Sequence, residues 1–444
     1  MRKRFAFAIL AAPLWAQDPL SLKDAVQIAL AKHPTIEASA AALEAAQHRI
    51  EQARAGYYPK LNYTESYTRS NNPVFVFSSK LAQRRFTAED FAIDSLNHPD
   101  SINNFQSQVM LDQLVYDFGM TKNVVQAARL GADIASQDER RARMHVMVGV
   151  LRAYYGTVLS AESLRVAEEA VRSAEADLQR AEAIRAAGMS TDADVLSIRV
   201  HLASVREQRI RRSFDLEVAK AALNEALGLP LETPHTLAST LVPALVSDAT
   251  LAQLEQVAAA ERPEARQTLL AVQLAQAQAS SAKAGYWPRF FVRAGVEADR
   301  NKFLTEGGGN WLASAGLQWN LFNGFETRAR TREVSQALRG VRAQERRAAS
   351  GIRLEVREAY FSLQAAQERI EVARAAVQMA EESLRITTNR YESGLSNVTE
   401  LLRNETALLE TRLRHLTAIY DQRVAAGALE VAAGTLTIDS AVLN

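Results

Sequence analysis

The chain contains no cysteine in its 444 residues. Disulfide bonds, thiolate metal sites and cysteine nucleophiles are therefore excluded, and so is a lipid anchor on an N-terminal cysteine. Glycine and proline are scarce, with 19 and 11 residues respectively. Few of them interrupt the long runs of alanine, arginine, glutamate and leucine in the middle and C-terminal third of the chain. Runs of that composition favour long helices.

Long apolar runs are missing as well. No segment after the N-terminus has the ~20 uninterrupted apolar residues of a membrane helix. At the N-terminus, Arg2, Lys3 and Arg4 precede a short apolar stretch that ends near Ala16, which predicts a secretory signal peptide over residues 1–16. A buried N-terminal helix is the alternative. We expect an exported chain of this kind to be periplasmic, secreted or inserted as a β-barrel.

The sequence also lacks the residue patterns of catalysis and ligand binding. None of the 7 histidines has the spacing of a metal site. The glycines at 307–309 lack the Lys-Ser/Thr of a phosphate loop and predict a turn between two strands. Ser280 and Lys283 match Ser-x-x-Lys by coincidence, without companion motifs. The net charge of +1 gives no sign of nucleic-acid binding. We predict no enzyme activity, no metal and no cofactor.

The chain contains an internal repeat. Ala-Gly-Tyr-Tyr-Pro-Lys at 55–60 recurs as Ala-Gly-Tyr-Trp-Pro-Arg at 284–289, and Gly188 recurs as Gly394. Such repeats indicate one structural plan used twice. The predicted segments are a signal peptide at 1–16, a first repeat at 17–227, a linker at 228–250, a second repeat at 251–435 and a tail at 436–444.

Each copy predicts a short helix, a proline-initiated helix, two strands, a very long helix, a glycine turn and a returning helix. In the first copy the long helix runs from Met120 to about Ala187, and the returning helix covers Asp192–Leu227. Apolar residues alternate at spacings of three and four along both long helices, which indicates a coiled-coil seam. An ordinary bundle core is the alternative. The seam residues are Leu164, Ala167, Val171, Ala174, Leu178 and Ala181, then Ile370, Ala373, Val377, Ala380, Leu384 and Thr387.

The expected strands alternate apolar and polar residues with a period of two. Their length of about 10–12 residues suits a tilted membrane strand, although a soluble sandwich would alternate in the same way. Trp311 and Trp319 are expected on one apolar face, as parts of two aromatic belts. Four strands cannot close a barrel, so copies of the chain are expected to share one of eight, twelve or sixteen strands. An insertion at 70–104, rich in asparagine, is expected to form turns at the outer end.

In this order, the motifs resemble TolC-type outer-membrane efflux proteins. The resemblance rests on the duplicated plan, the two Ala-Gly-Tyr motifs, Val-Tyr-Asp-Phe-Gly at 115–119, Leu-Phe-Asn-Gly at 321–324, and the two turn glycines. It implies a mainly α fold with a small β part. It also implies a homotrimer with a twelve-stranded barrel among outer-membrane lipids and a twelve-helix periplasmic tunnel. A periplasmic adaptor and an inner-membrane pump would be the partners. The competing interpretation is a structural or adaptor-like periplasmic coiled-coil protein.

The resemblance also assigns roles to residues near the glycine turns. Asp194 and Tyr391 match residues of the network that closes the periplasmic end. Glu400 falls where one member has the first of two aspartates lining the constriction, and Arg403 falls where the second would be. Ser396 replaces an arginine of that member. The tips expected to dock an adaptor are Gly188, Met189, Ser190, Gly394, Leu395 and Ser396. A solvated helix face is the alternative reading of these charged residues.

Overall fold

The computed structural model describes residues 19–246, 248–304 and 307–443, so the predicted signal peptide lies outside the described residues. Helices dominate and one small antiparallel sheet accompanies them, which confirms the mainly α fold with a small β part. Within the described part of the chain, no helix combines the length and apolar character that crossing a bilayer requires. The chain divides into two compact units, and each takes residues from both copies of the repeat.

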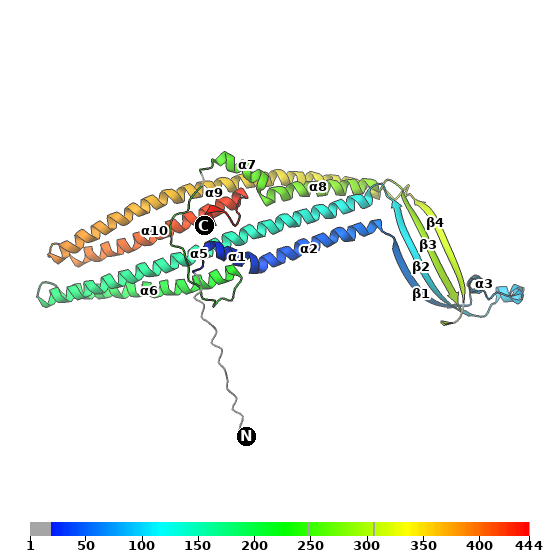
Figure 1. Cartoon of the computed structure of the whole chain (residues 1–444), viewed down its shortest axis with the longest axis horizontal. Coiled ribbons are helices and arrows are strands. Elements are labelled where there is room, and N and C mark those ends of the chain that lie inside the picture. Colours follow the sequence, from blue (N-terminus) through cyan, green and yellow to red (C-terminus); the bar gives the residue numbers. More distant parts are fainter. Residues whose placement is uncertain (1–18, 247, 305–306, 444) are drawn as a thin grey trace, which may run out of the picture. The chain divides into compact units, whose positions relative to one another are not determined.

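The first unit comprises residues 1–41, 137–267 and 346–444. The long helices α5 and α9 each have 67 residues, and the returning helices α6 and α10 each have 36, so the two copies match in length. Figure 1 shows α5 turning into α6 and α9 turning into α10. The helices that lie wholly or mainly in this unit are α1 (Leu22–Lys32), α5 (Met120–Ala186), α6 (Asp192–Leu227), α7 (Leu251–Glu261), α9 (Glu326–Glu392), α10 (Val398–Ala433) and the 3-10 turn Ala441–Leu443.

The predicted seam holds the two helical hairpins together. Ala174 and Ala181 are fully buried, and Val171 and Leu178 pack beside them against residues of α6 and α10. Alanine at alternate seam positions allows close approach of the helices, which larger side chains would prevent. The coiled-coil prediction is therefore confirmed.

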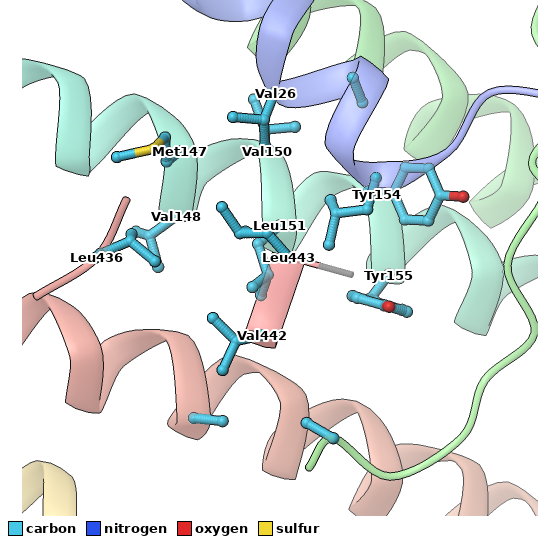
Figure 2. Packing of buried hydrophobic residues seen from close by; sticks show 14 of the residues in the cluster. Val26, Met147, Val148, Val150, Leu151, Tyr154, Tyr155, Leu436, Val442 and Leu443 are labelled. Atoms are coloured by element: carbon cyan, nitrogen blue, oxygen red, sulfur yellow. The ribbon is translucent and has the colours of Figure 1, made fainter. Parts of the chain in front are cut away.

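The largest apolar core of this unit joins both copies to the linker between them (Figure 2). Tyr154 is fully buried; its hydroxyl donates to the carbonyl of Leu20 at 2.8 Å and accepts from the backbone N–H of Ser239, in the linker, at 3.2 Å. The guanidinium of Arg423 lies 4.6 Å from the ring centre of Tyr155 and donates to the carbonyl of Val242 at 2.7 Å. The linker is thus fixed to the helices by buried polar contacts, which are costly to break.

The second unit comprises residues 42–136 and 268–345 and contains the sheet. The strands run in the order β1-β2-β3-β4, and each pair is antiparallel. Two helices that start at prolines lead to the motifs before β1 and β3, as the sequence predicts. The elements that lie wholly or mainly in this unit are α2 (Pro34–Arg54), β1 (Lys60–Ser70), α3 (Pro73–Ala82), α4 (Ile93–Asn97), β2 (Ile102–Tyr116), α8 (Pro263–Ala284), β3 (Arg289–Arg300) and β4 (Gly308–Gln318), with 3-10 turns at Ala55–Tyr57 and Ala88–Phe91.

The pairing register gives the sheet one polar and one apolar face. Because side chains alternate along a strand, paired residues share a face. The polar face carries Asn62, Thr64, Ser66, Thr68, Asn104, Gln106, Gln108, Asp112, Arg293, Glu297, Asp299, Asn310 and Ser314. The opposite face carries Leu61, Tyr63, Tyr67, Phe105, Val109, Leu111, Phe290, Val292, Val296, Trp311 and Leu317, and it also holds the ion pair of Glu65 with Arg300.

Two details of the second strand pair differ from the prediction. β4 ends at Gln318, so Trp319 lies beyond the strand, and its indole nitrogen donates to the carbonyl of Tyr286 at 3.0 Å. Gly308 and Gly309, predicted as turn residues, begin β4 and pair with Asp299 and Ala298. Because glycine has no side chain, these residues can pair with β3 at a place where a larger residue would collide with neighbouring backbone.

The insertion at 70–104 is also more ordered than a set of turns. It contains α3 and α4, and Asn72 caps α3 by accepting from the backbone N–H groups of Val74 and Phe75. Asn103 and Asn104 lie within β2 rather than in a turn. Their tertiary contacts decide this placement, because asparagine alone favours turns.

Candidate functional site at the hairpin tips

The two hairpin tips have the same backbone geometry. Gly188 has φ +76° and Gly394 has φ +74°, a left-handed conformation that side chains disfavour. Each tip closes its long helix with a backbone hydrogen bond from the residue after the glycine, Met189 N to Ile184 O at 3.1 Å in the first hairpin. The repeated glycine therefore marks a repeated chain reversal, as the sequence predicts.

Helix residues near both tips form one apolar cluster in the first unit. Tyr391 of α9 is 8% exposed and lies among buried residues of α5, α6 and α10. The cluster consists of Ala181, Val195, Ile198, Tyr391, Val398 and Leu401. The two hairpins are therefore packed on each other near their turns.

Asp194 performs a local structural task at the start of α6. Its carboxylate accepts from the backbone N–H of Thr191 at 3.1 Å, from the Thr191 hydroxyl at 2.8 Å and from the Ser190 hydroxyl at 3.1 Å. The Thr191 hydrogen bonds lower the pKa of Asp194. Together with the reciprocal bond from the Asp194 backbone N–H to the Thr191 hydroxyl oxygen, at 3.2 Å, they form a capping box.

Tyr391 holds a hydroxyl that has no hydrogen-bond partner within the described chain. Burial raises the pKa of Tyr391, and the negative charges of Asp194 and Asp177 raise it further. A buried hydroxyl without a partner is costly, so this atom lowers the stability of the cluster in which it lies.

Glu400 and Arg403 are both exposed on the first turns of α10. The backbone N–H of Glu400 donates to Asn397 Oδ1 at 2.9 Å, which caps the helix, and the Ser396 hydroxyl donates to the Glu400 carboxylate. Among the ion pairs of the described residues, none involves Arg403. Ser396 thus orients Glu400, while the Arg403 guanidinium is free to meet another molecule.

A cluster of buried polar side chains lies one to two helical turns beyond Glu400, and the sequence analysis did not predict it. The carboxyl groups of Asp177 and Glu405 lie beside each other, and His201 Nε2 lies 3.2 Å from Glu405. Ser173 donates to Glu405 at 2.9 Å, and Arg180 pairs with Asp177 at 2.6 Å. The only sequence signal is the position of Asp177 next to the seam residue Leu178, where a charge is unexpected.

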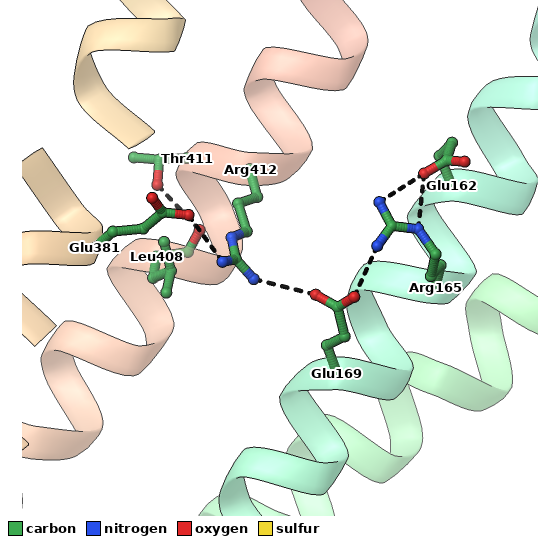
Figure 3. A network of polar contacts seen from close by, with 7 residues as sticks. All are labelled: Glu162, Arg165, Glu169, Glu381, Leu408, Thr411 and Arg412. Carbon is green, nitrogen blue, oxygen red and sulfur yellow. Dashed lines mark hydrogen bonds and ion pairs between the residues drawn. The ribbon is translucent and has the colours of Figure 1, made fainter. Parts of the chain in front are cut away.

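A second network of charges links the hairpins further along (Figure 3). Arg412 of α10 pairs with Glu169 of α5 at 3.2 Å and with Glu381 of α9 at 2.8 Å. Arg165 pairs with the same Glu169 at 2.7 Å and with Glu162 at 2.8 Å. Shared acceptors orient these side chains more firmly than isolated surface pairs would.

No arrangement at the tips suggests chemistry on a bound molecule. Within the described ranges, no group of three or more His, Asp or Glu residues could hold a metal ion. The tips instead present a pair of packed hairpins with charged and apolar side chains around their turns.

Comparison with known proteins identifies the kind of molecule. The sequence profile of the family described as outer membrane efflux protein matches residues 25–229 and 254–435. The chain belongs to this family. An outer membrane efflux protein resides in the outer membrane and acts as a channel in export, and its helices extend into the periplasm.

Individual relatives of this efflux protein support the assignment to the family. Protein CyaE of Bordetella pertussis is 28% identical over 438 residues, which cover 95% of this chain and 86% of CyaE. The alkaline protease secretion protein AprF of Pseudomonas aeruginosa is 26% identical, over 72% of this chain and 64% of AprF. The crystal structure of CusC shares the fold with a TM-score of 0.80 at 19% identity, over 97% of this chain and 99% of CusC.

Proposed function

We propose that three copies of this chain form the exit duct of a tripartite efflux or type I secretion system. The duct is a passive conduit, and an inner-membrane pump supplies the energy through a periplasmic adaptor. It performs no catalysis on the cargo. Family membership supports the channel role, and the open sheet carries the proposal that copies assemble.

The open sheet is the decisive observation. Within the described chain, β1 pairs with β2 alone and β4 pairs with β3 alone, so both outer strands have an unpaired edge. In a bilayer each unpaired backbone group costs several kcal/mol. Pairing β4 of one copy with β1 of the next removes every edge, and three copies give the twelve strands that the TolC-type resemblance implies.

Exposed apolar residues on two helices support the same assembly. On α9, Val372, Met379 and Ile386 are exposed at heptad spacing. On α6, Val200 and Phe214 are 71% and 68% exposed. We propose that the α9 stripe of one copy packs on the α6 stripe of the next. Because the two stripes lie on different helices, this contact joins the copies head to tail, as a closed ring requires.

The hairpin tips have two proposed tasks. Asp194, Tyr391, Glu400 and Arg403 control closure of the periplasmic mouth, where symmetry repeats each side chain around the axis. The tips at 188–190 and 394–396 dock the adaptor. Exposure supports docking, since Met189 and Leu395 are 75% and 70% exposed at the two turns.

The cargo class differs among the relatives themselves. AprF is named for protease secretion, and a CusC relative from Escherichia coli, 24% identical, is named for cation efflux. We therefore propose a duct whose cargo is selected by the pump.

The experiment is a mass measurement of the detergent-solubilised protein, combined with recording in planar bilayers. We expect three copies of the chain in one particle and stable single-channel currents. A monomer that inserts into lipid, or a trimer without conductance, would contradict the proposed duct.

A further inference from the structure

The segment between β1 and β2, residues 71–101, lies against the sheet and is named the cap segment here. Gln83 Nε2 donates to the carbonyl of Asn103 at 2.9 Å and to Oδ1 of Asn104 at 2.8 Å. Asn104 Nδ2 in turn donates to Asp299 Oδ1 at 2.7 Å. Gln83, Asn104 and Asp299 are each at most 8% exposed. A buried relay of this kind ties the cap segment to two strands.

A close backbone contact reinforces this attachment. A Cβ atom on Gly308 would lie 1.7 Å from the carbonyl oxygen of Ala82, so only glycine permits the approach. Arg84, whose own φ is +58°, donates to the carbonyl of Gly309 at 2.9 Å. Gly308 pairs with Asp299 across the ladder, so the approach of the Ala82 carbonyl to Gly308 lies on the same face of the sheet as the side-chain relay.

The cap segment is folded in its own right. Lys80 pairs with Asp90 at 2.6 Å, and this hydrogen bond lowers the pKa of Asp90 to about 2. The Phe86 ring meets Phe77 and Phe91 edge to face, with ring centres 4.9 and 5.0 Å apart. The cap segment can therefore move as a body when its contacts with the sheet are released.

Its position relative to the strands follows from the chain path. It leaves the end of β1 at Ser70 and enters β2 at Ile102, whereas α2 and α5 join the opposite ends of these strands. Its side-chain tether to Asn104 and Asp299 and its close approach to Gly308 lie on the polar face. In a membrane barrel the apolar face meets lipid and the polar face lines the lumen.

We propose that the cap segment is a lid that narrows the outer opening of the channel and is held closed by the Gln83–Asn104–Asp299 contact. This inference rests on the proposed trimeric duct. Three copies bring three lids to one opening, each folded inward over the lumen face. Their release widens the exit independently of the hairpin tips.

The test compares single-channel currents of the full trimer in planar bilayers. Gln83→Ala removes the side-chain tether and leaves the strand residues in place. In a trimer whose periplasmic mouth is opened by Glu400→Ala with Arg403→Ala, it is expected to raise conductance about twofold or more, because the outer opening is then the narrower section and sets the current. It should also admit larger uncharged polymers added on the outer side. Asn97→Ala, an exposed position in the same segment, is the matched control and should change neither quantity.

A locked variant makes the test reversible. Since the chain has no cysteine, Gln83→Cys with Asn104→Cys provides the only two thiols. In the same background with the opened mouth, a short reducible thiol cross-linker should hold conductance low, and its reduction should raise conductance above that of the trimer that carries only Glu400→Ala with Arg403→Ala. Unchanged conductance and polymer size limit in an assembled Gln83→Ala trimer of this background would overturn the lid. An unmodified trimer that forms no channel would instead overturn the proposed duct, and the lid with it.

Discussion

The carboxyl group of Asp177 in α5 lies beside that of Glu405 in α10, inside the contact between the two copies of the repeat. Two carboxylates in one buried site cannot both carry a charge without a large penalty, so they share a proton. Burial and the hydrogen bond with Glu405 raise the pKa of Asp177 to about 8. Burial opposes ionisation of Glu405 too, but hydrogen bonds with His201, Asp177 and Ser173 outweigh it and lower the pKa of Glu405.

This pair makes hairpin packing depend on pH. Because the folded-state pKa of Asp177 lies above its ordinary value of 3.8, the folded protein keeps a proton that the unfolded chain releases. The contribution of Asp177 to the free energy of unfolding is fully present at low pH and is lost as pH rises toward about 8. The free energy of unfolding then falls by at most about 1.4 kcal/mol per pH unit. Asp177→Asn replaces the shared proton by a permanent N–H donor, and its melting temperature should fall less between about pH 5 and 8.

Thermal melts of the trimer in detergent at a series of pH values measure this effect. Glu175→Gln is the matched control, since Glu175 lies on the same helix in an exposed pair with Arg206 at 2.7 Å. The control should keep the pH slope of the unmodified protein. An Asp177→Asn protein with that same slope would show that the carboxyl pair does not titrate in this range.

Removing Glu400 and Arg403 should open the periplasmic mouth. Replacing both with alanine should raise single-channel conductance and weaken its dependence on salt, because charged rings at a constriction attract and hold ions. Glu410→Ala with Arg414→Ala removes an exposed pair, 2.9 Å apart, from the same helix and is the control. If both double variants conduct like the unmodified channel, the constriction lies elsewhere.

Tyr391→Phe separates packing from gating. The tyrosine hydroxyl is buried without a partner in the described chain, so its loss should leave stability unchanged or raise it by about 1 kcal/mol. If this hydroxyl helps to hold the mouth closed, the variant should conduct more while it melts normally. A large drop in melting temperature with unchanged current would assign Tyr391 to the core alone.

The turn glycine Gly394 should resist substitution more than a helical glycine does. Its Cβ would meet no atom within 4 Å, so Gly394→Ala should lose about 1 kcal/mol of stability through its left-handed φ alone. Gly340→Ala, exposed within α9 and equally free of contacts, should instead gain about 1 kcal/mol. Denaturant titration of both variants measures the opposite signs, and two losses of equal size would remove the conformational explanation.

The exposed stripe on α9 should be required for assembly. Val372→Glu places a charge in the proposed contact between copies, where an unpaired buried charge is strongly unfavourable. The particle mass should fall from three copies to one. Gln378→Glu adds the same charge at an exposed position of α9 beside the stripe, and it should remain trimeric. Trimers from both variants would place the contact on another surface.

Much of this fold could be predicted from the residues because local patterns carry it. The turn glycine Gly188, the heptad seam and the alternation of the strands each depend on neighbours within a few positions. The long helix predicted from Met120 to about Ala187 ends at Ala186, and the returning helix has the predicted bounds of Asp192–Leu227. The same locality explains the error at Trp319, since the end of β4 depends on its pairing with β3.

The sequence by itself therefore determined the duplicated plan, the lengths of the helices and the two faces of the sheet. Tertiary structure alone decided that Asp177 meets Glu405 and that Gln83 of the insertion reaches Asn104 and Asp299. It also showed that Asp194 completes the capping box whose N-cap residue is Thr191. The physical reason is the difference between local and long-range interactions. Periodicity in the sequence indicates which side of an element is buried, but a contact between residues distant in the sequence exists only after the chain has folded.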